Sequence, residues 1–264
     1  MARKIVLASG QAPIPKEPVN PMSRVNRVIG VVSGKGGVGK SSLTAGIAIE
    51  LCSMGQNVLV VDFDIGMGCL DLILASDDTG IFNWGDVISG SCEPAQALRS
   101  TVGPSLLTAP TYFSDEYNEK SVREMIENYD DSFDYILMDA PAGVSGGFLL
   151  AAACADEGII VSTADDVCVR VGSFAGDKLS TLGVGEIKLI INRFNKKQTT
   201  RGHYLNIDEV IDATSLQLIG VVPEDSKISY CSVTGMRMLD NSKAKEAFKR
   251  IAMRLEGFNI NLKL

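Results

Sequence analysis

Histidine is nearly absent from this chain of 264 residues, in which His203 is the single example. A mechanism that needs a pair of histidines is therefore excluded, and one built on a histidine base would have to place His203 in the site. The cysteines form neither a C-x-x-C pair typical of a metal site nor the close framework of a disulfide-rich domain, so we interpret them as reduced thiols. They are Cys52, Cys69, Cys92, Cys154, Cys168 and Cys231. Carboxylates, lysines and backbone amides are left to carry the chemistry.

Long apolar runs and a net positive charge are also missing. The longest apolar run, Phe148–Ala155, is far shorter than the roughly 18 to 20 residues that cross a bilayer, and the first residues do not resemble a secretory signal. We therefore expect a cytoplasmic protein that reaches a membrane at most through a partner. Lys and Arg number 25 against 32 Asp and Glu, a net charge of −7, which disfavours broad binding to nucleic acid.

The hydrophobic pattern divides the chain into an arm and one domain. Residues 1–27 contain four of the nine prolines, a composition that favours extended backbone. Over residues 28–264, short Val- and Ile-rich runs alternate with helical patterns, which predicts a three-layer α/β fold with a mostly parallel sheet and helices on both faces. The expected strands are Val28–Ser33, Asn57–Asp62, Leu106–Ala109, Phe133–Asp139, Gly158–Ser162, Ile187–Asn192 and Gln217–Val221. The expected helices are Ser41–Met54, Ser121–Tyr129, Ser145–Ala155, Val167–Leu182, Ile207–Asp212 and Ser242–Glu256.

A glycine-rich loop between the first strand and the first helix carries the strongest motif. It fits G-x-x-x-x-G-K-[ST], whose glycines turn backbone N–H groups toward one centre while the next helix contributes the positive end of its dipole. This context predicts a P-loop NTPase fold and a polyphosphate ligand, with Lys40 on the β and γ phosphates and the Ser41 hydroxyl on Mg²⁺. The nucleotide-binding residues expected here are Gly34, Lys35, Gly36, Gly37, Val38, Gly39, Lys40, Ser41 and Ser42.

Three carboxylates follow strands in the order that such a site requires. Asp62 and Asp64 stand two apart on an extended segment, so both can face the phosphates where the second strand ends. Capping of a loop or helix is the alternative role for each. Asp139 ends a later apolar strand, which is the position of a carboxylate that contacts Mg²⁺, most simply through water. An ordinary solvent-facing strand end is the alternative there.

Together these motifs resemble those of the MinD/ParA/Mrp ATPases, over nearly everything from Val28 to Glu256. Lys35–Ser41 is similar to the deviant phosphate loop of that family, Asp62–Gly66 to its switch I and Asp139–Gly143 to its switch II. The resemblance implies that Lys35 reaches the phosphates of a partner subunit in a dimer. It also implies that Asp64 orients the attacking water, that Asp62 and Asp139 organise Mg²⁺, and that the Gly143 amide senses the γ phosphate.

Two later segments resemble those that build the adenine pocket in the family. The first is Asn192 and Arg193, at the end of the sixth expected strand. The second is Pro223, Glu224 and Asp225, after the seventh. By this resemblance the Asn192 amide reads the base, the backbone after the last strand closes the pocket, and the nucleotide is ATP or ADP and not GTP. The alternative for Asn192 is a turn residue at a strand end.

The function implied is a slow, Mg-dependent ATPase that dimerises on ATP and acts, like MinD members of the family, in spatial regulation of cell division. A regulatory partner of MinC or MinE type is expected. The open alternatives are a flagellar-number regulator, a ParA-like partition ATPase, an Mrp-type iron–sulfur carrier and a nucleotide-dependent scaffold without hydrolysis. The last residues, Phe258–Leu264, alternate like a strand, which makes direct membrane anchoring doubtful. The basic stretch Asn195–Arg201 is a candidate contact for acidic lipid or nucleic acid, and the alternative, more common for runs of charge, is a solvated loop.

Overall fold

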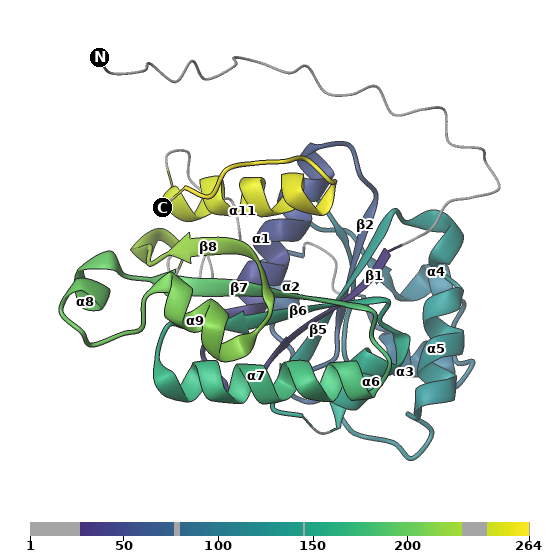
Figure 1. Ribbon diagram of the computed structural model, residues 1–264. Coiled ribbons are helices and arrows are strands. Elements are labelled where there is room, and N and C mark those ends of the chain that lie inside the picture. Colours follow the sequence, from purple (N-terminus) through teal and green to yellow (C-terminus); the bar gives the residue numbers. More distant parts are fainter. Residues whose placement is uncertain (1–26, 77–79, 145, 229–241, 264) are drawn as a thin grey trace, which may run out of the picture.

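An eight-stranded sheet runs through the middle of the molecule in the computed structural model, which describes residues 27–76, 80–144, 146–228 and 242–263 (Figure 1). The strand order is β3-β4-β2-β5-β1-β6-β7-β8, and every neighbouring pair is parallel except the antiparallel pair β3 and β4. The strands are β1 (Arg27–Ser33), β2 (Val58–Asp62), β3 (Leu98–Arg99), β4 (Ser105–Leu107), β5 (Tyr135–Ala142), β6 (Glu157–Ser162), β7 (Glu186–Phe194) and β8 (Gln217–Pro223).

Helices cover both faces of the sheet. One face carries α1 (Lys40–Ser53), α2 (Leu70–Ile73) and α11 (Lys243–Leu255). The other carries α3 (Trp84–Ile88), α5 (Glu119–Glu127), α6 (Gly147–Cys154), α7 (Asp166–Thr181) and α9 (Ile207–Thr214). The short helices α4 (Pro94–Ala97) and α8 (Lys196–Thr200) and the 3₁₀ turn η1 (Asp130–Ser132) lie in connections. None of the helices described is both long and apolar enough to span a bilayer.

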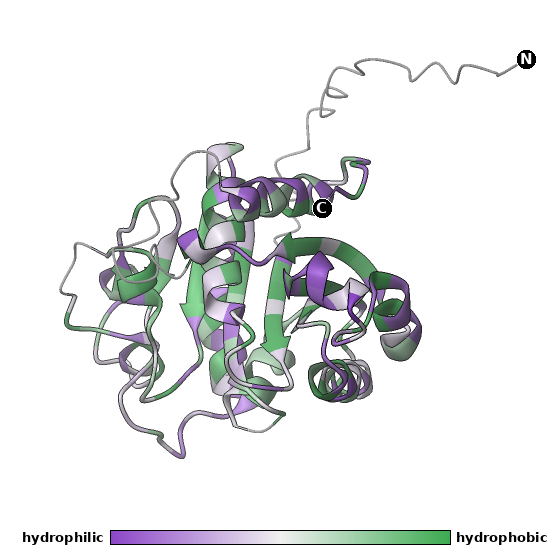
Figure 2. Ribbon diagram, turned by 90° about the vertical axis from the view of Figure 1, so that its left-hand side faces the viewer, coloured by the Kyte–Doolittle hydropathy of each residue, from purple (hydrophilic) through white to green (hydrophobic). Residues whose placement is uncertain are grey.

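Alternation along the strands explains the two layers of core. In β1, Val28 and Val32 pack in the core beneath α5, α6 and α7, whereas Ile29 and Val31 pack beneath α1 and α11. A parallel sheet that is buried on both sides needs apolar residues at successive positions, which accounts for the Val- and Ile-rich runs. Figure 2 shows this as hydrophobic strands at the centre and hydrophilic residues on the outer side of α11. The expected fold class is therefore confirmed.

Helix α11 packs closely against α1 and is fixed near both of its ends. A Cβ at Gly46 would lie 2.3 Å from the ring of Phe248, so the two helices touch at a position where only glycine fits. At the start of α11, the Ser242 hydroxyl donates to Asp225 Oδ2 over 2.9 Å and accepts from the Lys245 amide. Such side-chain bonds satisfy amides that the first helical turn leaves unpaired.

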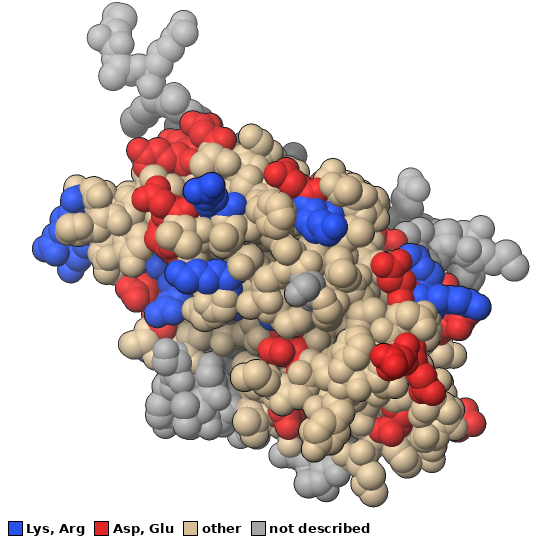
Figure 3. Space-filling view, turned by 90° about the horizontal axis from the view of Figure 1, so that it is seen from below, with Lys and Arg blue, Asp and Glu red and all other residues tan. Residues whose placement is uncertain are grey.

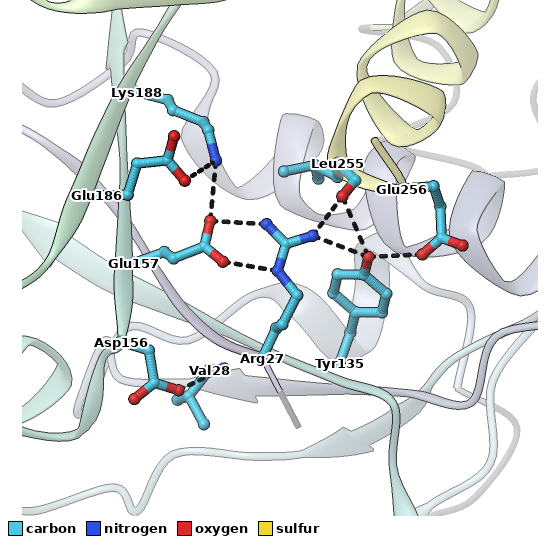
Figure 4. Close-up of polar contacts among 9 residues, drawn as sticks. All are labelled: Arg27, Val28, Tyr135, Asp156, Glu157, Glu186, Lys188, Leu255 and Glu256. Carbon is cyan, nitrogen blue, oxygen red and sulfur yellow. Dashed lines mark hydrogen bonds and ion pairs between the residues drawn. The ribbon is translucent and has the colours of Figure 1, made fainter. Parts of the chain in front are cut away.

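A network of charged groups holds the other end of α11 to the amino ends of the strands (Figure 4). Arg27 donates to both carboxylate oxygens of Glu157 over 2.6 Å, and Lys188 Nζ lies 2.9 Å from the same carboxylate. Arg27 also donates to the Leu255 carbonyl and to the hydroxyl of Tyr135. Burial of Glu157 favours its neutral form, but the hydrogen bonds from Arg27 and Lys188 outweigh this and lower its pKa. The network therefore joins β1, β6 and β7 to the end of α11.

The structure departs from the expected elements where these are short. Strand β3 and helices α2, α3 and α4 were not predicted, and each has five residues or fewer. Helix α8 forms within Asn195–Arg201, so the interpretation of that stretch as a loop is wrong: the Asn195 side chain accepts from two amides of the first turn and nucleates the helix. The strand-like alternation of Phe258–Leu264 does not form a strand in the residues described, 258–263, which lie along α11 through bonds from Arg250 and Arg254. Ser145, the first residue of one expected helix, lies outside the described residues.

Candidate nucleotide-binding site

The glycine-rich loop connects the carboxyl end of β1 to the first residue of α1, which is Lys40. A Cβ at Gly34 would lie 2.4 Å from the backbone oxygen of Val171 in α7, so the close approach of these two segments requires glycine. Gly39 adopts a φ of +86°, a left-handed conformation that L side chains rarely adopt. The sequence therefore places the start of a 14-residue helix, with its free N–H groups, directly after a tight turn.

Strand β7 holds this loop from the side. The Asn192 side chain, which is buried, donates from Nδ2 to the Val38 carbonyl over 2.7 Å, and its Oδ1 accepts from the Arg193 amide. Arg193 itself has a φ of +52° and donates to the Gly37 carbonyl over 3.2 Å. Asn192 thus contacts the phosphate loop in addition to facing the cavity where the base is expected. The sequence offers no signal for this contact, which joins residues 154 positions apart.

Lys40 and Asp139 form a buried ion pair at the centre of the site. The Lys40 Nζ lies 2.8 Å from Asp139 Oδ1, and the side chains are only 9% and 2% exposed. Thr44, one helical turn after Lys40, lies with its hydroxyl 3.0 Å from the same oxygen. The structure therefore brings two predicted residues, the loop lysine and the strand-end carboxylate, into direct contact. Thr44 is a third member that the motif does not mark, although its position at i+4 from Lys40 faces the same way.

Asp62 lies beside this pair because β2 and β5 are neighbours in register, with Asp62 opposite Asp139. Its carboxylate accepts hydrogen bonds from the amides of Asp64 and Leu70. Burial and the nearby charge of Asp139 raise the pKa of Asp62 to about 7. A Cβ at Gly68 would lie 2.7 Å from Asp62 Oδ2, so the switch I segment closes over this carboxylate only with glycine there.

Trp84 supports the same segment from beneath. Its indole Nε1 donates to the Asp62 carbonyl over 2.8 Å, and its ring lies 5.5 Å from the ring of Phe63. Both rings are fully buried. Asp64, which follows Phe63 in the sequence, is partly exposed. Burial raises the pKa of its carboxyl, although the charge of Lys40 acts in the opposite direction. Asp62 and Asp64 therefore flank one anchored aromatic residue.

Switch II continues the line of β5. Gly143 has a φ of +92°, and its amide donates to the Ser33 carbonyl over 3.0 Å. The Gly143 N–H, which is expected to contact the γ phosphate, is therefore hydrogen-bonded to the last residue of β1, the strand that precedes the phosphate loop. Any contact of this amide with a nucleotide requires that the Ser33 bond first break.

A cavity of about 430 Å³ opens beside the loop, between α1, the end of β8 and α11. Its apolar lining suits a planar base and consists of Leu43, Pro223, Ile228 and Phe248. Ser42, Asn192, Arg193, Glu224 and Asp225 complete the wall. The Glu224 carboxylate accepts from Asn195. Burial of Asp225 would raise its pKa, but hydrogen bonds from the Lys227 amide and Ser242 outweigh this and lower it. The two carboxylates are therefore held by protein groups.

Lys35 is exposed on the opposite side of the loop. It lines a separate hollow of about 240 Å³ together with Thr163, Asp165, Cys168 and Arg193, at the start of α7. The basic side chains of α8 project nearby, at the left edge of the face seen in Figure 3. The second lysine of the loop thus lies away from the Lys40–Asp139 pair and faces outward.

The donor set suits Mg²⁺ bound to a nucleotide better than a metal held by protein alone. Ser41, Asp62 and Asp139 offer oxygen atoms, which Mg²⁺ prefers. Among the described residues, no group of three or more His, Cys, Asp or Glu side chains gathers to hold a metal ion. The residues present therefore fit an ion whose remaining ligands are phosphate oxygens and water.

A strand, a glycine-rich loop and a helix that begins at the motif lysine, with carboxylates on the two neighbouring strand ends, define a P-loop NTPase. The model of the ParA family, described as NUBPL iron-transfer P-loop NTPase, matches residues 24–256. The chain belongs to this ParA family. The expected membership of the MinD/ParA/Mrp group is thereby confirmed.

Within the family, the chain is similar to MinD proteins. It is 34% identical over 243 residues to the septum site-determining protein MinD of Synechocystis sp., covering 89% of this chain and 91% of that protein. The MinC:MinD cell division protein complex of Aquifex aeolicus matches with a TM-score of 0.83 and 32% identity, over 90% of this chain and 98% of that one. MinD of Pyrococcus horikoshii complexed with Mg-ADP matches with a TM-score of 0.78 and 27% identity, over 88% and 96%.

Proposed function

We propose that this P-loop NTPase is a Mg-dependent ATP switch that acts, like the MinD proteins it resembles, in spatial regulation of cell division. The observation that carries the proposal is the buried Lys40–Asp139 pair at the mouth of a glycine-rich loop, beside a cavity that suits a base. The Synechocystis and Aquifex proteins, which the chain matches over nearly its whole length, support the cellular role. Hydrolysis is proposed to be slow and stimulated by a protein partner of MinC or MinE type.

The chain's own residues divide the work of the site. Lys40 leaves Asp139 and donates to the β and γ phosphates, where it stabilises charge that builds during transfer. Bound Mg²⁺ would supply further neutralisation of that charge, with Ser41, Asp62 and Asp139 as the residues that hold it or its water. Asp64, partly exposed at the edge of switch I, orients the attacking water. Release of the Gly143 amide from Ser33 leaves that N–H free to meet the γ phosphate.

ATP or ADP occupies the cavity beside the loop in this proposal. The base lies against Leu43, Pro223 and Phe248, which line the cavity. Asn192 and the backbone from Pro223 to Asp225 supply the polar contacts to its edge. Because the Asn192 side chain already donates one hydrogen to Val38 and accepts from the Arg193 amide, its second N–H and the second lone pair of its oxygen remain for the base.

A homodimer completes the site in this proposal, with Lys35 of each subunit reaching the phosphates bound by the other. Lys35 is exposed on the rim of the loop and away from its own Lys40, which supports a role across an interface. The family description names iron transfer. Of the described cysteines, however, only Cys69 is exposed, and a cluster carried at an interface needs paired thiolates. The switch is therefore favoured over the iron–sulfur carrier.

Light scattering and phosphate release, measured with MgATP and with MgADP, test the proposal. We expect the wild-type protein to dimerise with MgATP and return to monomer as phosphate is released. Asp64→Ala should bind ATP but persist as a dimer, whereas Lys35→Ala should bind ATP as a monomer. Lys197→Ala, on the exposed face of α8, is the matched control for loss of a lysine. A wild-type protein that stays monomeric and releases no phosphate with MgATP would refute the switch.

A further inference from the structure

Large apolar side chains are exposed in switch I and in the loop that follows β4. Met67 is 79% exposed, Tyr112 82% and Phe113 60%, and Ile81 is exposed to 88%. Two contacts bring the first three together: the Gly66 amide donates to the Pro110 carbonyl over 3.1 Å, and a Cβ on Gly66 would lie 3.1 Å from the Thr111 oxygen. Several large apolar side chains left in water on one surface indicate a binding site.

A line of aromatic rings connects this surface to the catalytic segment. Phe113 lies 5.9 Å from Tyr117, Tyr117 lies 4.7 Å from Trp84, and Trp84 lies 5.5 Å from Phe63, measured between ring centroids. Phe63 stands between Asp62 and Asp64, and Trp84 donates to the Asp62 carbonyl. The packing is tight, since a Cβ at Gly85 would lie 2.3 Å from the Tyr117 hydroxyl. A ligand bound over Phe113 would therefore be connected to switch I through these neighbouring rings.

Most of the charges near Phe113 and Tyr117 are acidic, although Lys120 in the first turn of α5 and Arg99, which lines a hollow with Gly66 and Thr111, are basic. Asp86 and Glu116 are the charged groups that act on Tyr117, and with its partial burial they raise the pKa of that hydroxyl. Asp115 and Glu119 are exposed in the same loop and first helical turn. A second copy of the chain packed symmetrically on this surface would bring like charges together, which disfavours it. The surface instead fits a basic segment with bulky apolar residues.

The chain carries such a segment before its first strand. Residues 1–26 contain four basic residues and one acidic one, and Arg3-Lys4-Ile5-Val6-Leu7 combines two charges with three apolar side chains. The surface is within reach. Strand β1, with seven residues, is about 23 Å long. Strand β4, which precedes the aromatic loop, lies three strands away from β1, or about 14 Å. The nineteen residues between Leu7 and Arg27 span up to about 65 Å when extended.

We propose that Arg3–Leu7 of the same chain binds the surface formed by Met67, Tyr112 and Phe113. Ile5, Val6 and Leu7 cover the exposed aromatic side chains, and Arg3 and Lys4 face Asp86, Asp115 and Glu116. Through Phe113, Tyr117 and Trp84, this contact would connect the amino-terminal arm to Phe63 in switch I. It does not depend on nucleotide, so it can hold or fail independently of the ATPase function proposed above.

The test uses the full chain without nucleotide and two charge-reversed variants of the arm. Arg3→Glu/Lys4→Glu should lower the hydrogen-exchange protection of amides 112–118 by about two- to threefold, as expected for a tethered segment whose effective concentration is near its Kd. The fluorescence of Trp84, the single tryptophan, should change with it. Lys16→Glu/Arg24→Glu makes the same charge change outside the apolar run. It should change neither the protection of amides 112–118 nor the fluorescence of Trp84.

Two substitutions test the surface itself. Phe113→Ser should reproduce the loss of protection, while Phe174→Ser, at an equally exposed phenylalanine on α7 (59%), should leave it unchanged. Equal protection and equal Trp84 emission in wild type and Arg3→Glu/Lys4→Glu would overturn the proposal and leave the surface to a separate partner protein. Protection that rises with protein concentration would also overturn it, because the occupant would then belong to a second copy.

Discussion

Lys40 and Asp139 neutralise each other, with Nζ and Oδ1 2.8 Å apart and both side chains nearly inaccessible to water. One comes from the first turn of α1 and the other from β5, ninety-nine positions later in the chain. The pair therefore has two roles. It prevents two buried unpaired charges, and in the proposed function it separates so that Lys40 can reach a phosphate.

Lys40→Met should abolish phosphate release from MgATP, with a loss of about 100-fold or more, because the loop loses its only buried cation. The substitution should also lower the free energy of unfolding by about 3 kcal/mol, since the Asp139 carboxylate is left buried without a cation. Phosphate release and urea unfolding measure the two effects. Lys197→Met, an exposed lysine, is the control, and an active Lys40→Met protein would exclude Lys40 from the chemistry.

The stability of the nucleotide-free protein should depend on Asp62. Its pKa is about 7 in the folded protein against an ordinary value of 3.8, so folding favours the protonated form. The stabilising contribution is complete below about pH 4 and is lost as the pH rises through 7. Asp62→Asn, which cannot ionise, should therefore become progressively more stable than wild type between pH 4 and pH 7. Urea unfolding at several pH values without Mg²⁺ measures this, and parallel pH profiles of the two proteins would contradict the raised pKa.

Asn192→Ala should weaken nucleotide binding mainly through the phosphate loop. The Val38 carbonyl loses its donor, and a buried carbonyl without a partner costs about 1–3 kcal/mol, or about 5- to 150-fold in affinity if the loop must be reordered on binding. Equilibrium binding of ADP and GDP distinguishes the two roles of the residue. A similar loss for both indicates that Asn192 holds the loop, whereas a selective loss for ADP indicates that it reads adenine.

Gly46→Ala should destabilise the fold by about 1–3 kcal/mol, because its methyl group would overlap the Phe248 ring between α1 and α11. Gly176→Ala is the matched control in the middle of α7, where the nearest atom is 3.3 Å away at the end of a leucine side chain. There the better helix propensity of alanine should make the change neutral or stabilising. Thermal unfolding measures both, and equal melting temperatures for the two variants would show that α1 and α11 can separate without loss.

The sequence predicts what is local or periodic in this protein. The phosphate loop is contiguous, so Lys40 and the start of α1 follow from the motif and its flanking strand and helix. Asp62 and Asp139 could be brought together in advance because both end parallel strands, and such ends meet at one edge of a sheet. In the structure, β2 and β5 pair in parallel with Asp62 opposite Asp139, which agrees with that rule.

The remaining contacts depend on packing that no sequence pattern marks. Asn192 meets Val38 only because β7 lies two strands from β1. Trp84 meets the Asp62 carbonyl from a helix of five residues, which is too short to show a period. Strand β3 has two residues and forms by pairing with β4. The sequence identifies Gly143 as a switch II residue. It does not predict the hydrogen bond from the Gly143 amide to the Ser33 carbonyl, which depends on the conformation of switch II.

The position of α11 makes this helix a wall of the cavity in which we propose that the base binds. Phe248 forms one side of the cavity beside the phosphate loop, and the Leu255 carbonyl receives Arg27 from the first strand. A chain that stopped before Lys243 would therefore retain the predicted motifs but lack Phe248, and the cavity would lose one of its sides. During synthesis, the complete cavity can form only after the last helix has emerged.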